Sequence, residues 1–288
     1  MADPVSVGII VPCLNRVDVL ASALDSVLEQ ECSPLQIIVV DGGSTDGTID
    51  IIRSYEDHLA WWVSEPDSGQ SDAINKGFDQ CTAQVVNWLC CDDELTPGAL
   101  TFVQEFFSAN SEAQWLVGGC EMIYPEKPRR NFVFHPPSDT WELIPSFNGI
   151  MQPSSFWRRS ITSRRPLVDT SFNYALDAEL WCHFKECGAR PILTKRVLSR
   201  FIQSGDNKTA VGGRDIGLEL ERIYRHYTED RIPLSTWYRW LRYPFELRLR
   251  RDKGWLRLGF LRVIQVCYIL CLAPFYGWRR VWKMSWPS

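Results

Sequence analysis

The chain has 288 residues and a formal net charge of −4, and 13 of its residues are Trp. This length allows one large domain, or one domain with an appendage, and the composition is otherwise ordinary for a globular protein. Asp3 and Pro4 interrupt the start of the chain, so no secretory signal peptide is predicted. The ten Cys show no paired zinc-ligand spacing, so we expect reduced thiols in the cytoplasm and no structural zinc.

The charge is distributed unevenly along the chain. Residues 237–288 contain eleven Lys or Arg, two acidic residues and six of the 13 Trp, and their net charge is +9. The preceding 236 residues therefore carry a net charge of −13. This asymmetry predicts a C-terminal segment whose partner differs from that of the rest of the chain.

Four strands are predicted in the first part of the chain, each followed by a loop and a helix. Their apolar runs cover residues 5–11, 35–40, 60–63 and the stretch that begins at Val85. Asn15 and Ser71 are predicted to cap the helices after the first and third strands. Because strand, loop and helix alternate with short connections, we expect a parallel sheet with right-handed crossovers.

Polar side chains follow each of these strands, and they are Asn15, Asp41, Asp67 with Asp72, and Asp92 with Asp93. The carboxyl ends of parallel strands meet at one edge of a sheet, where open α/β sheets bind ligands, so we expect a nucleotide crevice there. No GxxxxGKS or GxxxxGKT motif occurs, and the glycines at 42, 43 and 47 lack GxGxxG spacing, which disfavours a dinucleotide site. The alternative for this glycine-rich loop is a tight turn alone.

Asp92, Asp93 and Glu94 directly follow the fourth apolar run. Three adjacent carboxylates repel one another unless a positive group joins them. A hard divalent cation, which prefers oxygen ligands, is the natural partner. The alternative is a solvated acidic turn that precedes a helix starting near Pro97.

The elements after this point are less regular. We expect a helix over 97–109, a strand over 115–124, an irregular Pro-rich stretch over 126–145, a strand or wall segment over 151–159, and a helix that opens near Asn173. Asp177 lies in the first turn of that helix, where the helix dipole favours a carboxylate. It is therefore either a helix-start acid or a functional group. Residues 201–213 form a polar loop in which Lys208 is a candidate phosphate ligand.

Six short strings occur in the order found in one enzyme family. They are VSVGIIVPCLNR, IIVVDGGSTDGT, SEPDSGQSDAINKGF, VNWLCCDDEL, QPSSFWRR and YALDAELW, and together they extend over about 180 residues. Through them the chain resembles the inverting glycosyltransferases of family 2. The resemblance implies an α/β GT-A fold, Rossmann-like, with a mostly parallel sheet flanked by helices. Residues 1–231 would form this domain, with a nucleotide-binding half (1–95) and an acceptor half (96–231), and 232–288 would be a basic, Trp-rich helical extension.

The resemblance also implies roles for individual residues. Pro12, Asn15, Asp41, Asp67, Asp72, Asn75 and Asp92 would line the nucleotide site, with Asp41 facing the base; Asp93 would bind the metal, Asp177 would be the general base, and Gln152, Pro153, Glu179 and Trp181 would border the donor sugar and the acceptor. The chain departs from the family pattern at Ile74, Cys91 and Gln203, where many members have an Arg, an acid or Asn, and a His. The last departure leaves a third protein ligand for the metal unassigned.

The implied activity is transfer of a sugar from a nucleotide-diphosphate donor, a UDP-sugar by family habit, to a hydroxyl of a glycan or lipid-linked glycan of the cell envelope. A Mn2+ or Mg2+ ion would neutralise the leaving diphosphate, and Asp177 would take the acceptor proton. Two alternatives stay open. One is direct transfer to a polyprenyl phosphate, and the other is a catalytically silent nucleotide-sugar binding module.

The C-terminal extension has an apolar run over about 263–276, which Gln265 and Pro274 interrupt. A membrane span needs about twenty apolar residues, so this run is short for one. Trp and Arg beside apolar positions fit a helix that lies in the membrane interface, which predicts peripheral contact with the anionic cytoplasmic face of the inner membrane. The alternative is a helical pair that packs on the core or forms a dimer. No recognition motif accompanies the basic charge, so nucleic acid is not predicted as a partner.

Overall fold

The computed structural model describes residues 4–145, 148–162, 166–205, 207–208, 212–228, 255–278 and 281–282. The strands are β1 (Val7–Cys13), β2 (Leu35–Asp41), β3 (Trp61–Ser64), β4 (Val85–Trp88), β5 (Asp93–Leu95), β6 (Trp115–Ile123), β7 (Phe132–Phe134), β8 (Ser155–Arg158) and β9 (Pro191–Ile202). The α-helices are α1 (Leu20–Leu28), α2 (Thr48–Ser54), α3 (Gln70–Gln80), α4 (Ala99–Ala109), α5 (Thr140–Leu143), α6 (Leu176–Glu186), α8 (Gly213–Tyr227) and α11 (Trp255–Tyr276). Short 3-10 helices η1 (Glu56–His58), η2 (Pro128–Arg130), η3 (Gln152–Ser154) and η4 (Arg159–Thr162) complete the order.

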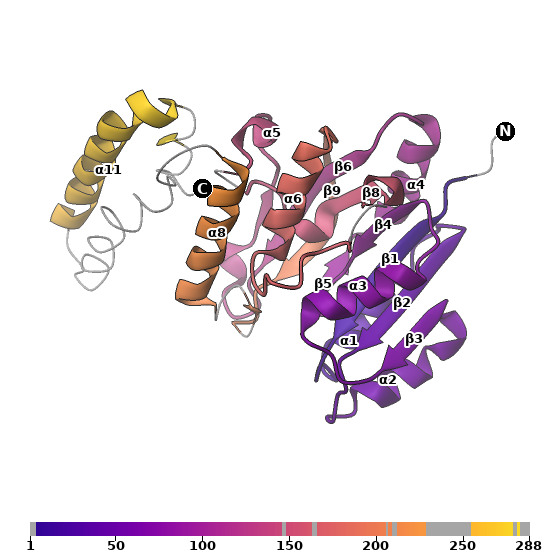
Figure 1. Ribbon diagram of the computed structural model, residues 1–288. Helices are drawn as coiled ribbons and strands as arrows, with labels where there is room; N and C mark the ends of the chain where they lie inside the picture. The colour runs from indigo at the N-terminus through magenta and orange to yellow at the C-terminus, as the bar shows by residue number, and fades with distance from the viewer. Residues whose placement is uncertain are drawn as a thin grey trace.

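All nine strands form one mixed sheet in the order β3-β2-β1-β4-β8-β6-β9-β5, with β7 paired to β6 (Figure 1). β1 runs parallel to β2 and β4, and β2 runs parallel to β3. The predicted parallel sheet is therefore confirmed for the first four strands. Beyond β4 the sheet is mixed, because β8 is antiparallel to both β4 and β6 while β6 and β9 are parallel.

The first strand continues further than the sequence predicts. β1 passes through Pro12 and ends at Cys13, which pairs with Asp41 of β2. Proline has no N–H to donate and is confined to strand positions without a partner on that side. β4 supplies no partner there, because its pairing with β1 ends where Trp88 lies opposite Ile10.

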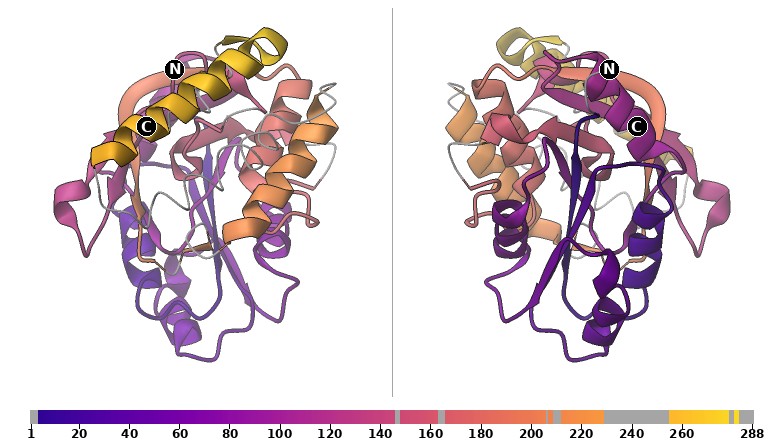
Figure 2. Two further views of the ribbon diagram at one scale, coloured as in Figure 1. Left: turned by 90° about the vertical axis from the view of Figure 1, so that its left-hand side faces the viewer. Right: turned by 90° about the vertical axis from the view of Figure 1, so that its right-hand side faces the viewer.

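The two faces of the parallel strands are both buried under helices (Figure 2). Alternate residues of β1 point to opposite faces, so Ile9 packs with α1 in one apolar cluster and Ile10 packs with α3 in the other. β2 alternates in the same way. Burial on both faces explains why these strands read as continuous apolar runs rather than as alternating patterns.

The two predicted helix caps are wrong. α1 begins at Leu20, and no side chain caps it. Asn15 instead adopts a left-handed φ of 52° and bonds to the loop after β2. Ser71 lies inside α3, and its hydroxyl donates to the carbonyl of Phe172 at 2.9 Å. In both cases a contact distant in sequence takes the side chain that a local pattern assigns to a cap.

Several elements were not predicted from the sequence. The predicted acidic turn contains a strand, because Asp93–Leu95 forms β5 and pairs antiparallel to β9. β9 itself carries charged residues such as Lys195 and Arg200 on a half-buried surface, so it lacks the apolar run by which strands are found. α8 is predominantly polar and was also not predicted.

Trp181 belongs to the hydrophobic core. Its ring packs against those of Trp88, Trp115, Trp157 and Phe184, with centroids 5.0–6.4 Å apart, and it is fully buried. This aromatic cluster ties α6 to the sheet through β4, β6 and β8. The prediction that Trp181 shapes an acceptor pocket is therefore wrong, because a side chain that is fully buried cannot border an open site.

The C-terminal helix α11 lies beyond α8, on the side away from the sheet (Figure 1). Tyr224 of α8 joins Tyr268, Ile269 and Leu272 of α11 in a small separate cluster. Whether the extension packs on the core or lies on a membrane stays a prediction. Residues 232–254 of the predicted extension lie outside the described residues. Within the described residues, no helix combines the length and apolarity needed to cross a membrane.

We predict that the same substitution has opposite effects at two helical glycines. A Cβ at Gly77 of α3 would lie 2.5 Å from Ile10 Cγ2 and 3.2 Å from Val40 Cγ2. Gly77→Ala is expected to lower the free energy of unfolding by about 1–3 kcal/mol, because overpacking at the sheet outweighs the gain in helix propensity.

Gly217 of α8 is the matched control, because a Cβ there meets nothing within 4 Å. Gly217→Ala is expected to raise the free energy of unfolding, or leave it unchanged, with a gain of up to about 1 kcal/mol. Urea unfolding of both variants measures the difference. Equal effects at the two sites would contradict the close packing of α3 on the sheet.

Candidate active site

Asp41 organises the loop at the carboxyl end of β2 from the inside. Its side chain is 0% exposed. Its Oδ2 accepts hydrogen bonds from the Gly43 N–H at 3.2 Å, the Ser44 N–H at 2.9 Å and Ser64 Oγ at 2.6 Å. Its Oδ1 accepts from Ser44 Oγ and, at 3.7 Å, from Cys13 Sγ. A carboxylate offers about four lone-pair sites, so the prediction that Asp41 faces a nucleotide base is wrong for this arrangement.

The ends of β1 and β2 are bonded to each other through Asn15. The Asn15 N–H donates to Ser44 Oγ at 2.6 Å, and its Oδ1 accepts from the Thr45 N–H at 2.9 Å. Asn15 itself stays exposed, whereas Pro12 is buried inside β1. The glycine-rich loop is thus more than a tight turn, because it is pinned to the neighbouring strand end.

The loop after β3 approaches the same edge. A Cβ at Gly42 would lie 2.8 Å from Asp67 Oδ2, so the close approach of these two strand ends requires glycine. Asp67 also accepts from the Gly69 N–H at 2.8 Å. Asp72 turns toward its own helix, where it accepts from the Ser68 N–H at 3.0 Å and lies 3.4 Å from Lys76 Nζ. Asp67 is therefore at the site edge, and Asp72 supports the start of α3.

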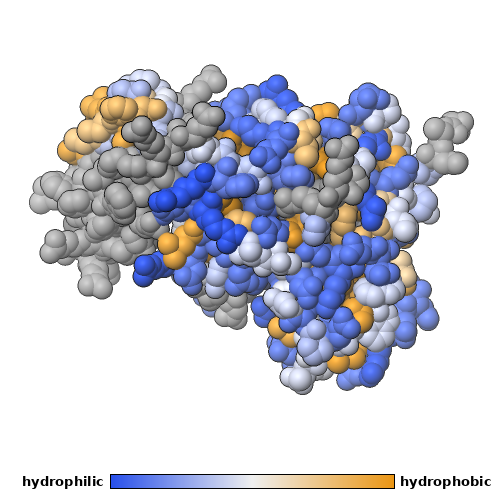
Figure 3. Space-filling model, viewed as in Figure 1, coloured by the Kyte–Doolittle hydropathy of each residue, from blue (hydrophilic) through white to orange (hydrophobic). Residues whose placement is uncertain are grey.

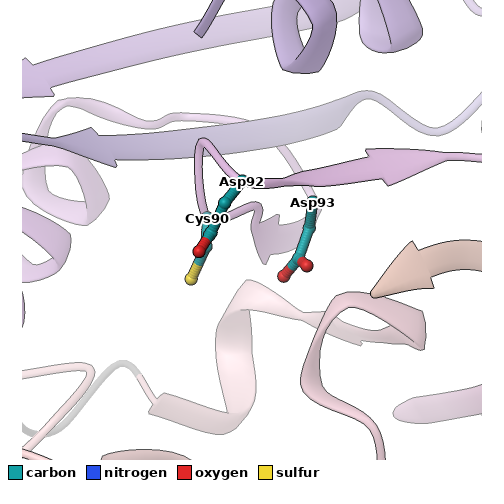
Figure 4. Close-up of side chains that lie close together, drawn as sticks. All are labelled: Cys90, Asp92 and Asp93. Carbon is teal, nitrogen blue, oxygen red and sulfur yellow. The ribbon is translucent and has the colours of Figure 1, made fainter. Parts of the chain in front are cut away.

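After β4 the chain brings three metal-binding groups together (Figure 4). One ligand atom from each of Cys90, Asp92 and Asp93 lies within 4.8 Å of the other two. The Gln70 amide donates to Cys90 Sγ at 3.2 Å, which holds the thiol in place. The sequence reading left a third protein ligand unassigned, and the structure offers the sulfur of Cys90. The position of Cys90 two residues before Asp92 was the sequence signal that could have indicated it as a metal ligand.

Asp93 is a buried carboxylate without a cationic partner among the described residues. Its side chain is 2% exposed and accepts only the Ile202 N–H, at 3.4 Å. Burial and the neighbouring Asp92 raise the pKa of Asp93 well above its ordinary value. Arg200, on the strand that pairs with β5, is paired with Glu94 at 3.4 Å and Glu121 at 2.9 Å. A buried anion of this kind is costly unless a metal ion or a proton neutralises it.

Asn207, in the polar loop after β9, contacts this cluster. Asn207 is 4% exposed, and its amide donates to Asp92 Oδ2 at 2.8 Å and to the Ile202 carbonyl at 3.0 Å. Burial lowers the pKa of Lys208, and negative charge at Cys90, Glu219 and Asp67 opposes this effect. Lys208 is thus electrostatically linked to two of the strand ends. The sequence reading found Lys208 but missed Asn207, which precedes it directly.

Gln152 and Pro153 lie against the end of β4. The Gln152 amide donates to Asn87 Oδ1 at 2.8 Å and to the Trp88 carbonyl at 2.7 Å. The Asn87 amide donates in turn to the Pro153 carbonyl at 3.1 Å. η3 is therefore fixed to the strand that leads into Cys90, and a role for Gln152 and Pro153 beside the donor sugar stays a prediction.

Asp177 and Glu179 have different surroundings although both lie in the first turn of α6. Asp177 is half-buried and accepts from the Asn148 amide at 3.2 Å and the Ala178 N–H at 2.7 Å. Burial raises the pKa of Asp177. Glu179 is 4% exposed and accepts from the Tyr227 hydroxyl at 2.6 Å, so the prediction that it shapes an acceptor pocket is wrong. Asn148 was not predicted from the sequence.

The segment that leads to Asp177 is fastened to the nucleotide side at three points. Asn75 makes two 2.9 Å bonds to the backbone of Val168, and its place in a nucleotide pocket stays a prediction. Ser71 bonds to Phe172, and Lys208 Nζ donates to the carbonyl and Oδ1 of Asn173 at 3.0 and 2.8 Å. Lys208 therefore joins the surroundings of Cys90 to the chain four residues before Asp177.

Comparisons with known proteins agree on one family. The family model "Glycosyl transferase family 2" matches residues 8–160. A PGL/p-HBAD biosynthesis glycosyltransferase of Mycobacterium tuberculosis is 39% identical over 236 residues, which cover 80% of this chain and 84% of the relative. An uncharacterized glycosyltransferase of Rickettsia typhi is 27% identical over 187 residues, which cover 62% of this chain and 58% of the relative.

Solved structures share the fold. S. aureus TarS 1–349 aligns with a TM-score of 0.61 and 14% identity, over 97% of this chain and 90% of that chain. A mannosyltransferase from Pyrobaculum calidifontis, solved with GDP-Man and Mn2+, aligns with a TM-score of 0.59 and 18% identity, over 99% of this chain and 85% of that chain. The chain therefore belongs to glycosyltransferase family 2, and it is a glycosyltransferase with the GT-A fold.

Proposed function

We propose that this glycosyltransferase transfers a sugar from a nucleotide-diphosphate donor to an acceptor hydroxyl, with inversion, at the edge formed by β1, β2, β3 and β4. The observation that carries the proposal is the buried carboxylate of Asp93 beside Cys90 and Asp92. This donor set fits a divalent cation, because two carboxylates and a sulfur converge and no ion pair of the described residues involves Asp92 or Asp93.

The choice of donor draws on the solved relatives. TarS has been solved with UDP-GlcNAc, and the Pyrobaculum mannosyltransferase with GDP-Man and Mn2+. We propose a UDP-sugar for this chain, with GDP-sugars as the competing class. Because Asp41 is saturated by its own loop, the groups that remain open to the nucleotide are Asn15, Asp67 and the backbone of the glycine-rich loop.

The chemistry follows from the two carboxylate environments. A divalent cation held by Asp93, Asp92 and Cys90 would neutralise charge on the leaving diphosphate. Asp177 takes the proton of the acceptor hydroxyl while the oxygen of that hydroxyl forms a bond to the anomeric carbon. The bond to the diphosphate breaks with its electron pair on the leaving oxygen. Lys208 would contact a phosphate of the donor in exchange for its bonds to Asn173. One in-line displacement without a covalent intermediate inverts the anomeric centre.

The acceptor is proposed from the relatives and from the retained base. The mycobacterial relative is named for PGL/p-HBAD biosynthesis, and we propose a hydroxyl of a glycan or lipid-linked glycan of the cell envelope for this chain. Direct transfer to a polyprenyl phosphate would not need a base, because a phosphate oxygen is already deprotonated. A silent binding module would have no use for Asp177 either, and its raised pKa favours the hydroxyl acceptor.

We predict that a nucleoside diphosphate stabilises the protein only when a divalent metal is present. At a hundredfold excess over the dissociation constant the gain is about 2.7 kcal/mol. A thermal-shift panel of UDP, GDP and dTDP, with and without Mn2+, measures it. Asp93→Asn is expected to abolish the metal-dependent part, while Asp50→Asn, an exposed acid of α2, leaves it unchanged.

The melting temperature without ligand checks that Asp93→Asn folds. Because burial raises the pKa of Asp93 in the folded state, its ionisation weakens folding as the pH rises through that pKa. The neutral Asn is therefore expected not to lower the melting temperature near neutral pH. A metal-dependent shift that survives in Asp93→Asn would remove Asp93 from the metal site.

We predict that Asp177 sets the acid limb of the pH–rate profile. Its raised pKa places the loss of kcat/KM at a higher pH than the ordinary Asp value of about 3.9. Activity is full above this pKa and falls as the pH drops through it, because a protonated Asp177 cannot accept a proton. Transfer, or donor hydrolysis with water as acceptor, is the measurement.

Two variants make this test specific. Asp177→Asn is expected to lower kcat by about two to four powers of ten and to remove the limb. Asn148→Ala is expected to move the limb to higher pH, because the Asn148 amide bond favours the charged carboxylate and lowers its pKa. An unchanged rate in Asp177→Asn would exclude it as the base.

We predict that Cys90 is a metal ligand. Co2+ bound through a thiolate gives a ligand-to-metal charge-transfer absorption, so Co2+ titration of the protein is expected to produce this band. Cys90→Ser removes it. Cys91→Ser is the matched control and keeps it, because Cys91 is buried and packs in the apolar cluster beneath β1. A band that survives in Cys90→Ser would show that Cys90 does not bind the metal.

A further inference from the structure

The helix α11 has two unlike faces. One face is buried, and its Tyr268, Ile269, Leu272 and Ala273 belong to one small apolar cluster with Tyr224 of α8. The other face exposes large apolar side chains. They are Val263, Val266, Leu270 and Phe275 within the helix and Trp278 and Trp282 just beyond it, and we call them the outer stripe. Figure 3 shows this area as orange over α11, at the upper left of the molecule.

The outer stripe is more than scattered surface hydrophobicity. Val263, Val266 and Leu270 follow one another at three and four residues, the spacing that places side chains on one side of a helix, and Phe275 follows five residues after Leu270. Each is 49–80% exposed, with Phe275 the most exposed. The other exposed large apolar residues of the described chain are Leu14, Phe132, Val133, Ile192 and Leu218, and they are spread over separate elements. A continuous exposed apolar strip of this kind marks an interaction site.

Charge selects the partner. Residues 237–288, which contain the stripe, carry +9, and the preceding 236 residues carry −13. A second copy of the chain that packed stripe against stripe would bring two segments of +9 together. An anionic surface is attracted instead, and Trp side chains beside Arg are typical of helices that lie in a lipid interface. The finding that no described helix can cross a membrane is consistent with a helix that lies on its surface.

We propose that the outer stripe inserts into the headgroup region of an anionic membrane, to which the net charge of +9 on residues 237–288 attracts it. The opposite face of α11 stays packed on α8, so the membrane-bound helix remains joined to the glycosyltransferase body. α8 is joined to the active-site segment in turn, because Glu219 accepts from the backbone N–H groups of Asn173, Tyr174 and Ala175, at 2.8 Å each.

Docking itself does not depend on the sugar-transfer chemistry. Its consequence, that the acceptor hydroxyl is presented on a membrane lipid, rests on the proposed function. The same contacts through α8 would hold the segment before Asp177 close to the lipid surface.

The test is co-sedimentation of the full chain with vesicles of phosphatidylcholine alone and of phosphatidylcholine mixed with phosphatidylglycerol. Binding is expected with the anionic vesicles and is expected to weaken as salt rises, because each basic residue near the surface contributes roughly fivefold. Phe275→Ser, Trp278→Ser and Trp282→Ser combined are expected to reduce the partition coefficient at least about tenfold, since their apolar area no longer leaves water. The matched control combines Phe132→Ser, Val133→Ser and Ile192→Ser, which change equally apolar exposed residues of β7 and β9.

Several results would overturn the proposal. Equal binding to both vesicle types, or to neither, would remove the anionic membrane as the partner. Full vesicle binding by the stripe variant would show that the basic residues alone cause membrane binding and that the stripe does not insert. A dimer in solution that the stripe variant loses would assign the surface to a second copy. The nucleotide thermal shift of the stripe variant separates these failures from a failure of the proposed function, because the stripe is remote from Asp93 in the fold and the shift is expected to stay unchanged.

Discussion

The burial of Asp93 is the constraint on which the site depends. β5 pairs with β9, and this pairing places the Asp93 side chain inside the protein, next to Asp92 and Cys90. The neighbouring cation, Arg200, lies across the same strand pair and is taken by Glu94. The fold thus buries a cluster of acidic groups, and no ion pair of the described residues involves Asp92 or Asp93. A metal ion that arrives with the nucleotide would relieve it, which couples donor binding to local stability.

The site is built across the whole sheet rather than within one segment. The parallel strands supply a rigid edge, and the later chain reaches back to it through short hydrogen bonds at Gln152 and Lys208. Asp177 arrives on α6, which the aromatic cluster fixes to the sheet through Trp181. The proposed metal ligands and the proposed base therefore lie on separate elements, whose relative position is set by the packed core. That arrangement suits a reaction in which proton transfer and departure of the diphosphate occur together.

The sequence predicted the repeated parallel strands, but it did not predict whether individual side chains point into the core or into the crevice. Continuous apolar runs and their polar ends identified the four parallel strands, because such runs arise whenever both faces of a sheet are buried. Asp41 and Trp181 were placed by family motif, yet whether a side chain points into the core or the crevice is decided by partners distant in sequence. β9 was missed for the same reason, since its partly charged sequence forms a strand through its pairing with β6 and β5, which are distant in sequence. Cys90 was visible in the sequence, but a thiol becomes a candidate ligand only once Asp92 and Asp93 are seen within its reach.

The central claim is that one carboxylate base and one buried metal cluster perform a single displacement at the anomeric carbon. The configuration of the first product tests it most directly. Nuclear magnetic resonance of the anomeric proton, followed from the start of turnover of an α-linked nucleotide-sugar donor, distinguishes the two outcomes. The account predicts that the first product is the β anomer. A first product that keeps the α configuration would contradict single displacement and the role of Asp177 as a base.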